Sequence, residues 1–453
     1  MSETQEPPPG TATPAPPARA SRRPGLPTLP AEMPGPFRRS FWRSPVRGPW
    51  LTSVLGLVLL PGITVMFVTG LLSYAAYNPD LSRLNDETPG KGWLGFYLFS
   101  WPTHPEWLYR VNQGTHVLLG LVLVPVLLAK LWSVLPKLFE WPPVRNPAHA
   151  LERLSLFLLV GGAIFEFVTG IMNIQQWYVF PGSFYTLHLY GAWVFIAAFV
   201  VHAGLKTPRM IRSLRSRGLR AELRTDTAHT HQEPPDEGHL VSPSPAAPTI
   251  SRRGVLAFTG AGSLLLLALS VGQSIGGPLR RTALLAPHGQ DTGSGPDDFQ
   301  INVTAAQAGI KAAETGANWR LSIARAAPGS GPPVSLTRAE LLAMPQHTAQ
   351  LSINCVEGWS TGDQSWTGVR LRDLAALAGS DTPASVLVES LNPRGFGHAV
   401  LSAGQIMDPD SLLAFHVNGA ELSADHGYPA RVIVPGSPGV HNTKWVTRLT
   451  FES

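Results

Sequence analysis

Residues 50–77 read WLTSVLGLVLLPGITVMFVTGLLSYAAY and contain no charged side chain. A helix of about 20 residues crosses a hydrocarbon core of about 30 Å, so this stretch predicts a membrane-spanning helix. Comparable apolar stretches occupy about 111–129, 154–175 and 183–205, and Glu166 is the one charged residue among them. Buried helices of soluble proteins rarely hold more than about 14 uninterrupted apolar residues. The four stretches predict a four-helix, all-α membrane domain over residues 50–208.

The composition of the whole chain agrees with a membrane protein. Charged residues make up 14% of the 453 residues, against about 25% in typical soluble proteins. This deficit excludes a purely cytosolic globular enzyme. The net charge of +5 comes from basic residues that border the apolar stretches, which indicates membrane orientation and no nucleic-acid partner. A single cysteine, Cys355, excludes an intrachain disulfide.

Basic residues predict the orientation of the helices in a cell membrane. Four of them flank the connection between the second and third helices, and six follow the fourth: Lys130, Lys137, Arg145 and Arg153, then Lys206, Arg209, Arg212, Arg215, Arg217 and Arg220. Positive charge stays on the cytoplasmic side. We therefore expect a multi-pass protein in the lipid bilayer with a cytoplasmic N-terminus.

The flanking segments predict linkers and a fifth helix. Residues 1–49 begin as a proline-rich, disordered tail and end as a basic segment, and residues 209–250 read as a cytoplasmic linker. Within residues 251–279, Arg252 and Arg253 precede an apolar run, as in twin-arginine export signals. The pair is also compatible with a plain positive-inside anchor of a fifth membrane helix. After a second linker at 280–297, the rest of the chain is expected outside the cytoplasm.

Histidines in the apolar stretches predict haem ligation. His188 and His202 are 14 residues apart, which places them about 40° apart on one helix face and about 21 Å apart in depth. His116 lies near the outer end of the second helix, at a depth similar to that of His188, so these two histidines are expected to ligate one haem b. Fourteen residues after His116 stands Lys130. A second haem at His202 would have His149 as its candidate partner, and the number of haems stays open.

Residues 50–208 resemble, in architecture and histidine placement, the four-helix bacterial cytochrome b561 group and related membrane anchors of dehydrogenases and reductases. The resemblance implies haem b and electron exchange with a quinone or quinol. Glu166 has two interpretations, proton transfer at a quinone site or a hydrogen bond to a neighbouring helix, and the sequence favours neither.

From Asp298 onward, short apolar strands alternate with loops and short helices. Strands are expected at Trp319–Ile323, Leu351–Asn354, Val386–Ser390 and Arg431–Val434, and a helix at Leu371–Ala378. Residues 298–453 therefore predict an α+β domain with more strand than helix.

Three motifs in this domain carry a specific resemblance. They are LSINCVEGWS at 351–360, WTGVRLRDL at 366–374, and DHGYPARVIVPG at 425–436 followed by Lys444 and Trp445. In this order they resemble the sulfite-oxidase superfamily of molybdopterin enzymes. The resemblance implies that Cys355 is the thiolate ligand of molybdenum in a molybdenum–molybdopterin cofactor. It also implies that Asn302, His426, Arg431 and Lys444 bind the pterin.

Two positions depart from the sulfite-oxidising members of that family. Ile301 stands where they have an arginine, and Phe396 matches their substrate-side tyrosine. Charge-assisted hydrogen bonds of roughly 1.5–3 kcal/mol each would be lost from an oxyanion pocket. Arg394 or His398 could compensate, so both are candidate catalytic residues together with Cys355 and Phe396.

These features predict a membrane-bound molybdopterin-dependent oxidoreductase that transfers an oxygen atom to or from a small oxo-substrate outside the cytoplasm. A neutral pocket favours sulfoxide reduction with electrons from haem b and quinol. Two alternatives remain open, a sulfite dehydrogenase that delivers electrons inward and a non-catalytic electron-transfer or cofactor-binding membrane protein. The intact Cys355, His426, Arg431 and Lys444 argue against the second.

Overall fold

The computed structural model describes residues 33–79, 81, 99–179, 182–236, 238–286, 292–326, 331–393 and 397–452. Most of the proline-rich tail (residues 1–32), for which we expect disorder, lies outside these residues, as do Arg394 and Phe396. After the tail, the basic segment forms two short 3-10 helices, Gly35–Phe37 and Arg39–Phe41.

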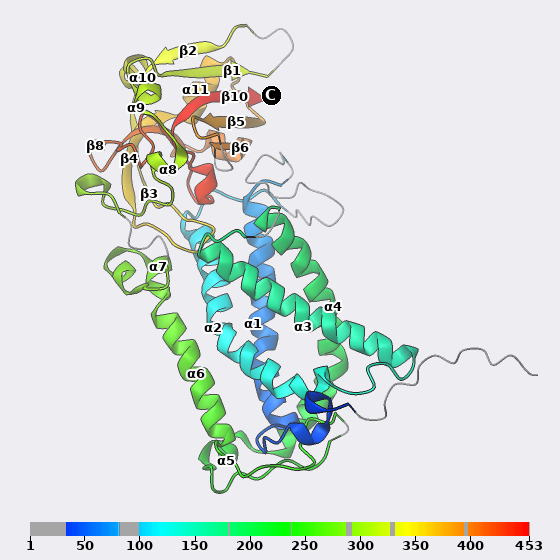
Figure 1. Cartoon of the computed structure of the whole chain (residues 1–453). Coiled ribbons are helices and arrows are strands. Elements are labelled where there is room, and N and C mark those ends of the chain that lie inside the picture. The colour runs from blue at the N-terminus through cyan, green and yellow to red at the C-terminus, as the bar shows by residue number, and fades with distance from the viewer. Residues whose placement is uncertain are drawn as a thin grey trace, which may run out of the picture.

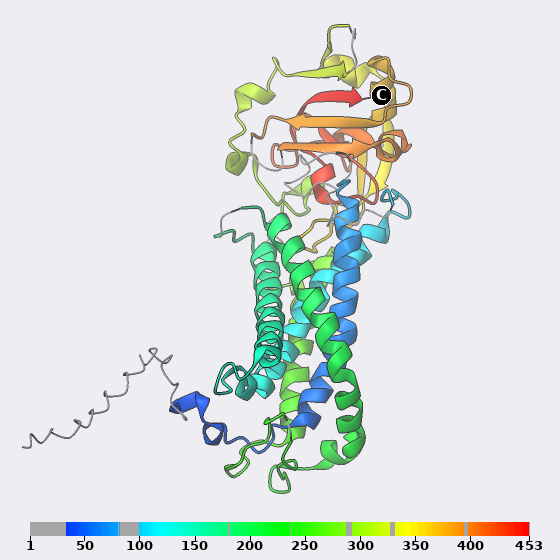
Figure 2. The same cartoon turned by 90° about the vertical axis from the view of Figure 1, so that its right-hand side faces the viewer.

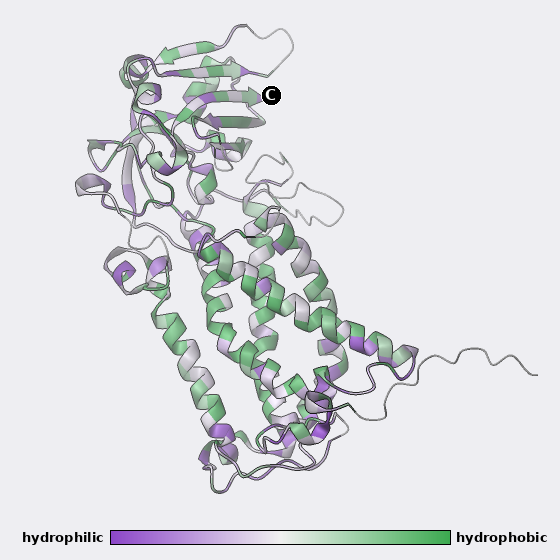
Figure 3. Cartoon of the chain, in the orientation of Figure 1, coloured by the Kyte–Doolittle hydropathy of each residue, from purple (hydrophilic) through white to green (hydrophobic). Residues whose placement is uncertain are grey.

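Among the described residues, five helices are long and apolar enough to cross a membrane. Four of them form a bundle: α1 (Pro49–Ala76), α2 (Trp107–Leu138), α3 (Pro147–Ile174) and α4 (Phe184–Ser216). The fifth span comprises α6 (Arg252–Ala268) and the short α7 (Val271–Ile275), with α6 packed beside α2. Large apolar side chains such as Leu128, Leu205 and Phe258 remain exposed on these helices, as expected for surfaces that face lipid. Figure 3 shows the apolar colour running along all five.

The two ends of the bundle differ. The sheet-containing domain caps one end, whereas the N-terminal 3-10 helices and the linker with α5 (Leu219–Arg224) lie at the other (Figures 1 and 2). At the linker end, the guanidinium of Arg252 is completely buried and pairs with Glu222 at 3.4 Å and Glu233 at 3.7 Å. It also donates to the carbonyl oxygens of Pro45 and His231. Arg252 therefore joins the linker to the start of α1.

The C-terminal domain is α+β and contains two five-stranded sheets. The first sheet has the order β2-β1-β10-β5-β6, and the second β3-β4-β7-β8 with β9 paired to β7. All pairs are antiparallel except β1 with β10. The strands are β1 (Arg320–Arg325), β2 (Val334–Thr337), β3 (His347–Leu351), β4 (Gln364–Arg370), β5 (Ser385–Ser390), β6 (His398–Ser402), β7 (Leu412–Val417), β8 (Ala420–Glu421), β9 (Arg431–Ile433) and β10 (Val446–Glu452).

Short helices precede the first strand or connect later ones. They are α8 (Ala305–Ala308), α9 (Ala312–Thr315), α10 (Arg338–Ala343), α11 (Leu371–Leu377) and α12 (Ala403–Met407), with 3-10 turns at Gly277–Thr282, Gly295–Asp297 and Gly439–His441. The helix expected at Leu371–Ala378 is confirmed as α11. The strand expected at Leu351–Asn354 is displaced, because β3 ends at Leu351 and Asn354 makes isolated bridges to Ser360 and Pro438. Cys355 therefore lies in the loop that follows β3.

One buried apolar cluster contains residues of both the bundle and the sheet domain. Ala75, Ala76 and Tyr77, at the end of α1, pack in the same buried cluster as Cys355 and Trp366. Asn78 then turns the chain at φ 52°, a left-handed conformation that asparagine tolerates. Its amide nitrogen donates to the Val400 carbonyl oxygen at 3.2 Å and to Gln405 Oε1 at 2.8 Å. The end of α1 is thus fixed to the C-terminal sheet domain.

Candidate functional site

A cavity lies beside Cys355. Polar and apolar residues from several loops line it: Tyr77, Asn302, Val303, Cys355, Val356, Asn392, Arg431, Gly439, Val440, Asn442, Thr443, Lys444 and Trp445. We call it the cysteine cavity. Its mixed lining suits a ligand with both polar and apolar parts.

The loop after β3 holds the thiol in place through backbone contacts. The Cys355 amide donates to the Trp359 carbonyl oxygen at 2.9 Å, and the Gly439 amide donates to the Asn354 carbonyl oxygen at 2.7 Å. A Cβ atom at Gly439 would lie 3.7 Å from the Cys355 Sγ, so glycine keeps space open beside the sulfur. Burial raises the pKa of the Cys355 thiol, and Glu357 raises it further. The thiol is therefore neutral until a metal ion displaces its proton.

Two buried cations face the same cavity. Arg431, on β9, donates to the carbonyl oxygens of Asn442 and His426, each at 3.2 Å. The Lys444 ammonium donates to the carbonyl oxygens of Asp425, at 3.0 Å, and Val303. Burial lowers the pKa of Arg431 to about 9 and that of Lys444 well below its usual value. Within the described part of the chain, neither cation forms an ion pair with a carboxylate.

This pair of cations fits an anionic cofactor. A buried, uncompensated positive charge is costly, and a bound phosphate or similar anion would relieve that cost with charge-assisted hydrogen bonds. The buried thiol supplies the soft ligand that such a cofactor's metal would need. The residues that line the cysteine cavity therefore fit a molybdenum–molybdopterin group.

The remaining predicted site residues of this domain take different places. Asn302 lines the cysteine cavity, and its Oδ1 accepts a hydrogen bond from the Val303 amide. The His426 ring is not among the lining residues; it contacts Ser423 Oγ at 2.9 Å and the Phe299 carbonyl oxygen at 3.3 Å. Burial lowers the His426 pKa to about 3, so its ring is neutral. His398 lies on β6 and does not line the cavity, while Arg394 and Phe396 lie outside the described residues.

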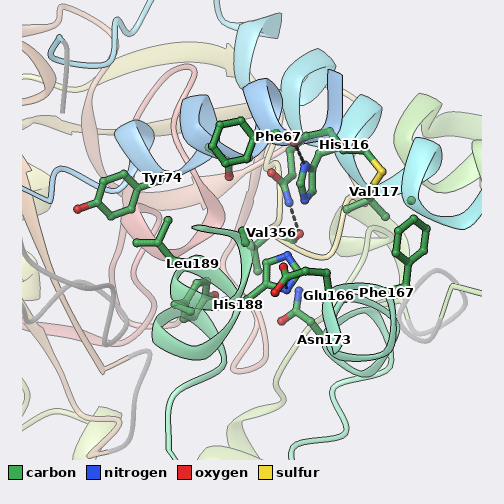
Figure 4. A pocket seen from close by; sticks show the side chains of 18 of the residues that line it. Phe67, Tyr74, His116, Val117, Glu166, Phe167, Asn173, His188, Leu189 and Val356 are labelled. Atoms are coloured by element: carbon green, nitrogen blue, oxygen red, sulfur yellow. Dashed lines mark hydrogen bonds and ion pairs between the residues drawn. The ribbon is translucent and has the colours of Figure 1, made fainter. Parts of the chain in front are cut away.

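A second, mainly apolar cavity lies inside the helix bundle, with an empty volume of about 1310 Å³. His116 on α2 and His188 on α4 face each other across it (Figure 4), with ring centres 6.3 Å apart. We call it the bundle cavity. The structure therefore brings together the two histidines that the sequence paired.

Each histidine is held through its Nδ1 atom. His116 Nδ1 lies 2.9 Å from the Met66 carbonyl oxygen and 3.2 Å from Thr69 Oγ1. His188 Nδ1 lies 3.1 Å from Glu166 Oε2 and 3.0 Å from Thr169 Oγ1. With Nδ1 engaged as a donor, each ring keeps Nε2 as an acceptor, which is the usual arrangement for a metal-ligating imidazole.

A short internal repeat underlies this pairing. The sequence FVTG occurs at 67–70 on α1 and again at 167–170 on α3. In both copies the threonine contacts a histidine, and the glycine that follows lies against the ring of that histidine. A Cβ atom would lie 3.1 Å from His116 Cε1 at Gly70 and 3.8 Å from His188 Cε1 at Gly170. The repeat is visible in the sequence alone, but it is not part of the site predicted from the sequence.

His202 and His149, the two histidines considered for a second haem, do not form a comparable pair. His202 lines neither the cysteine cavity nor the bundle cavity. Lys130 donates from its Nζ to the Thr52 carbonyl oxygen. His149 is half-buried at the start of α3, where its Nδ1 accepts from the Arg145 amide. Among these described residues, no partner is placed opposite His202.

The two cavities share a wall. Tyr77 and Val356 line both of them, and the amide of Gln113 on α2 donates to the Val356 carbonyl oxygen. Nothing in the sequence pattern of α1 identified Tyr77 as a site residue. Asn392, Asn442 and Thr443 were also missed, although Asn442 and Thr443 directly precede Lys444.

Comparison with known proteins bears on the C-terminal part of the chain. Residues 308–453 match the family model described as the oxidoreductase molybdopterin binding domain. Mitochondrial sulfite oxidase from Mus musculus is 37% identical over 153 residues, which cover 28% of this chain and 28% of that protein. An uncharacterized oxidoreductase of Bacillus subtilis, YuiH, is 31% identical over 119 residues, covering 26% of this chain and 59% of that protein.

Among solved structures, the sulfane dehydrogenase SoxCD from Paracoccus pantotrophus matches with 28% identity and a TM-score of 0.27, covering 30% of this chain and 38% of that one. The match covers 28% of the length of the mouse and rat sulfite oxidases. The matched residues hold Cys355, Arg431 and Lys444. The chain therefore carries, in its C-terminal part, a molybdopterin-binding oxidoreductase domain like that of the sulfite oxidase enzymes.

Proposed function

We propose that this protein is a membrane-bound molybdopterin-dependent oxidoreductase that transfers an oxygen atom at the cysteine cavity. One observation carries the proposal: a buried thiol shares a cavity with two buried cations that have no carboxylate partner among the described residues. Cys355 would ligate molybdenum, and Arg431, Lys444 and Asn302 would hold the pterin and its phosphate. His426 would act through its carbonyl oxygen, which positions the Arg431 guanidinium.

The proposed substrate class follows from the charged side chains that the cofactor would leave available in the cavity. When bound, the cofactor supplies two-electron oxygen-atom transfer, in which an oxo-substrate takes up two electrons and two protons and releases water. Because Arg431 and Lys444 would both serve the cofactor, the pocket offers a substrate no further described cation. This supports reduction of a sulfoxide or another neutral oxo-substrate.

The bundle cavity supports one haem b between His116 and His188. Two imidazoles that share one metal ion at about 2 Å from each nitrogen have ring centres about 6 Å apart. The 6.3 Å separation of these rings, their engaged Nδ1 atoms and the apolar lining all suit that ligation. His202 has no described partner, so we propose a single haem.

The shared wall supports electron exchange between the two cavities. Tyr77 and Val356 belong to both linings, so groups held on either side would be separated by about one side chain. A quinol in the membrane is the proposed electron donor. Glu166, whose Oε1 is buried without a hydrogen-bond partner among the described residues, would then take a proton next to His188.

Cofactor analysis tests this proposal directly. Purified protein should contain molybdenum, pterin and one b-type haem per chain, and added dimethyl sulfoxide should reoxidise the reduced haem. His116→Ala and His188→Ala should each abolish the haem absorbance band, whereas His202→Ala should leave it intact.

Each part of the proposal is contradicted by a different experimental result. Absence of molybdenum and pterin would refute the catalytic proposal, and an unchanged spectrum in both histidine variants would refute the haem assignment. Reduction of the haem by added sulfite would instead identify the sulfite dehydrogenase alternative.

A further inference from the structure

A further cavity lies at the linker end of the helix bundle, where α2 ends at Leu138. Three segments that are far apart in the sequence line it: residues 36–42 before α1, residues 136–145 around the connection from α2 to α3, and residues 239–242 of the linker. We call it the linker-end pocket. Because it lies at the end of a candidate membrane span, it is at the level where lipid headgroups meet the protein.

Aromatic rings form the apolar part of the wall. The Phe37 ring centre lies 5.6 Å from that of Phe139 and 5.9 Å from that of Trp141, and the Trp42 ring centre lies 5.7 Å from that of Phe139. These contacts hold the N-terminal segment against the connection from α2 to α3. Tryptophan is enriched at the level of lipid headgroups, so this wall suits a lipid neighbour.

Basic side chains form the polar part of the wall. The lining contains three permanent cations, Arg39, Lys137 and Arg145, and one carboxylate, Glu140. Lys137 and Arg145 pair with that carboxylate at 3.4 Å and 2.9 Å, whereas Arg39 lines the pocket without an ion pair among the described residues. The pocket therefore has an excess of positive charge and attracts an anion.

A ring nitrogen in the same pocket lacks a partner. His239 lines the pocket, and its Nδ1 is buried with no hydrogen-bond partner among the described residues. An unpaired buried polar atom is unfavourable, so a ligand that offers a hydrogen bond there would stabilise the pocket. A phosphate accepts hydrogen bonds from guanidinium, ammonium and imidazole N–H groups alike, and one phosphate group therefore suits both the cations and the histidine.

We propose that the linker-end pocket binds the phosphate headgroup of an acidic phospholipid of the surrounding bilayer. Basic pockets beside membrane helices recognise anionic headgroups, and a zwitterionic headgroup would bring a further cation to a pocket that already has an excess of them. The bound lipid would join the N-terminal segment, the connection from α2 to α3 and the linker. This inference is independent of the chemistry at the cysteine cavity.

The test measures lipid binding to the full-length protein in detergent. Native mass spectrometry gives the dissociation constant of the first bound phospholipid, for phosphatidylglycerol and for phosphatidylcholine with the same acyl chains. Arg39→Gln removes the cation without an ion pair, and His239→Phe removes the ring nitrogens. Arg43→Gln is the matched control, because Arg43 is an exposed arginine of the same N-terminal segment that does not line the pocket. Melting temperatures are recorded with each lipid and with inorganic phosphate.

We expect phosphatidylglycerol to bind more tightly than phosphatidylcholine and to raise the melting temperature, whereas inorganic phosphate should leave it unchanged. Arg39→Gln should weaken phosphatidylglycerol binding about fivefold, the effect of one cation at a membrane surface. His239→Phe should weaken it by a similar factor, through the loss of one hydrogen bond, and Arg43→Gln should bind as the wild type does.

Equal binding of the two lipids, or unchanged binding in Arg39→Gln or in His239→Phe, would overturn the inference. An equal loss in Arg43→Gln would also overturn it, because the effect would then come from diffuse surface charge. Stabilisation by inorganic phosphate to the same extent as by phosphatidylglycerol would show that the pocket takes a free phosphate and would refute the lipid assignment.

Discussion

At the scale of single residues, the cysteine cavity combines groups that are unfavourable on their own. Burial disfavours the charged forms of Arg431 and Lys444 and also the thiolate of Cys355. A ligand that brings both an anionic group and a soft metal would stabilise all three at once. Cofactor binding should therefore stabilise the folded domain as well as enable chemistry.

Replacing Cys355 should separate metal chemistry from cofactor binding. Serine is nearly isosteric with cysteine but is a much poorer ligand for a soft metal. We expect Cys355→Ser to abolish turnover while pterin stays bound, whereas Arg431→Ala should lower pterin occupancy. Turnover and bound pterin in detergent check both variants, and a fully active Cys355→Ser protein would contradict the assigned ligand.

Two buried histidines predict acid sensitivity of this domain. Burial lowers the pKa of His426 and of His441 to about 3 each, below the unfolded value of about 6.5. The unfolded state therefore binds more protons below pH 6.5, and the free energy of unfolding falls as pH drops toward 3. The loss should approach about 1.4 kcal/mol per pH unit for each histidine.

Thermal unfolding of the domain between pH 7 and pH 5 measures this effect. His441→Gln should remove about half of the pH dependence, because His426 still titrates. A melting temperature that is independent of pH over this interval would contradict the prediction.

At the scale of elements, the loop after β3 that carries Cys355 packs against the helix bundle at Gly358. Gly358 has φ +87°, and a Cβ atom there would lie 2.7 Å from Val117 Cβ on α2. The Ser274 hydroxyl of α7 donates to the Gly358 carbonyl oxygen. Gln176, in the loop after α3, donates from its side-chain amide to the Glu357 carboxylate. Several membrane elements therefore hold the loop that carries Cys355.

Gly358→Ala should loosen this docking. Left-handed backbone strain of about 1–3 kcal/mol adds to the overlap with Val117, so the melting temperature should fall by several degrees. Gly362→Ala is the matched control, because its Cβ atom would meet only Gln364 Nε2 at 3.9 Å. Equal melting temperatures for the two variants would show that the docking contact carries no stability.

The bounds of the helices show which part of each helix the sequence pattern predicted. The four apolar stretches predicted α1 to α4, but α2 continues to Leu138 and α4 to Ser216, past the basic residues that ended the predicted stretches. Long Lys and Arg side chains can extend from a helix end toward the polar surface, so charge marks the edge of the membrane rather than the end of the helix.

At the scale of the whole molecule, one candidate span, Arg252–Ile275, separates the 209–250 linker from the C-terminal domain, and the two lie at opposite ends of the bundle. With basic residues kept inside, we predict that a periplasm-specific alkaline phosphatase fused after Ser453 is active. A cytoplasm-specific fluorescent fusion at the same site should be dark, and the opposite pattern would contradict the orientation.

Export of the domain is best tested at Arg253. Arg252 is buried in ion pairs with Glu222 and Glu233, so its replacement would disturb folding as well as targeting. Arg253 is exposed. If the twin-arginine route is used, Arg253→Lys should reduce export of the domain while the purified protein melts as the wild type does; full export would contradict that route.

The sequence by itself determined the local features of this protein. Uninterrupted apolar runs specify membrane helices, and the positions of His116 and His188 within their runs predicted matching depths, because both properties can be read along the chain. The motifs around Cys355, Arg431 and Lys444 likewise identified the molybdopterin domain. Only the tertiary structure joined Tyr77 to the cysteine cavity and turned the His426 ring toward Phe299. Those placements depend on how the bundle and the two sheets pack against each other, and no local pattern of residues encodes that contact.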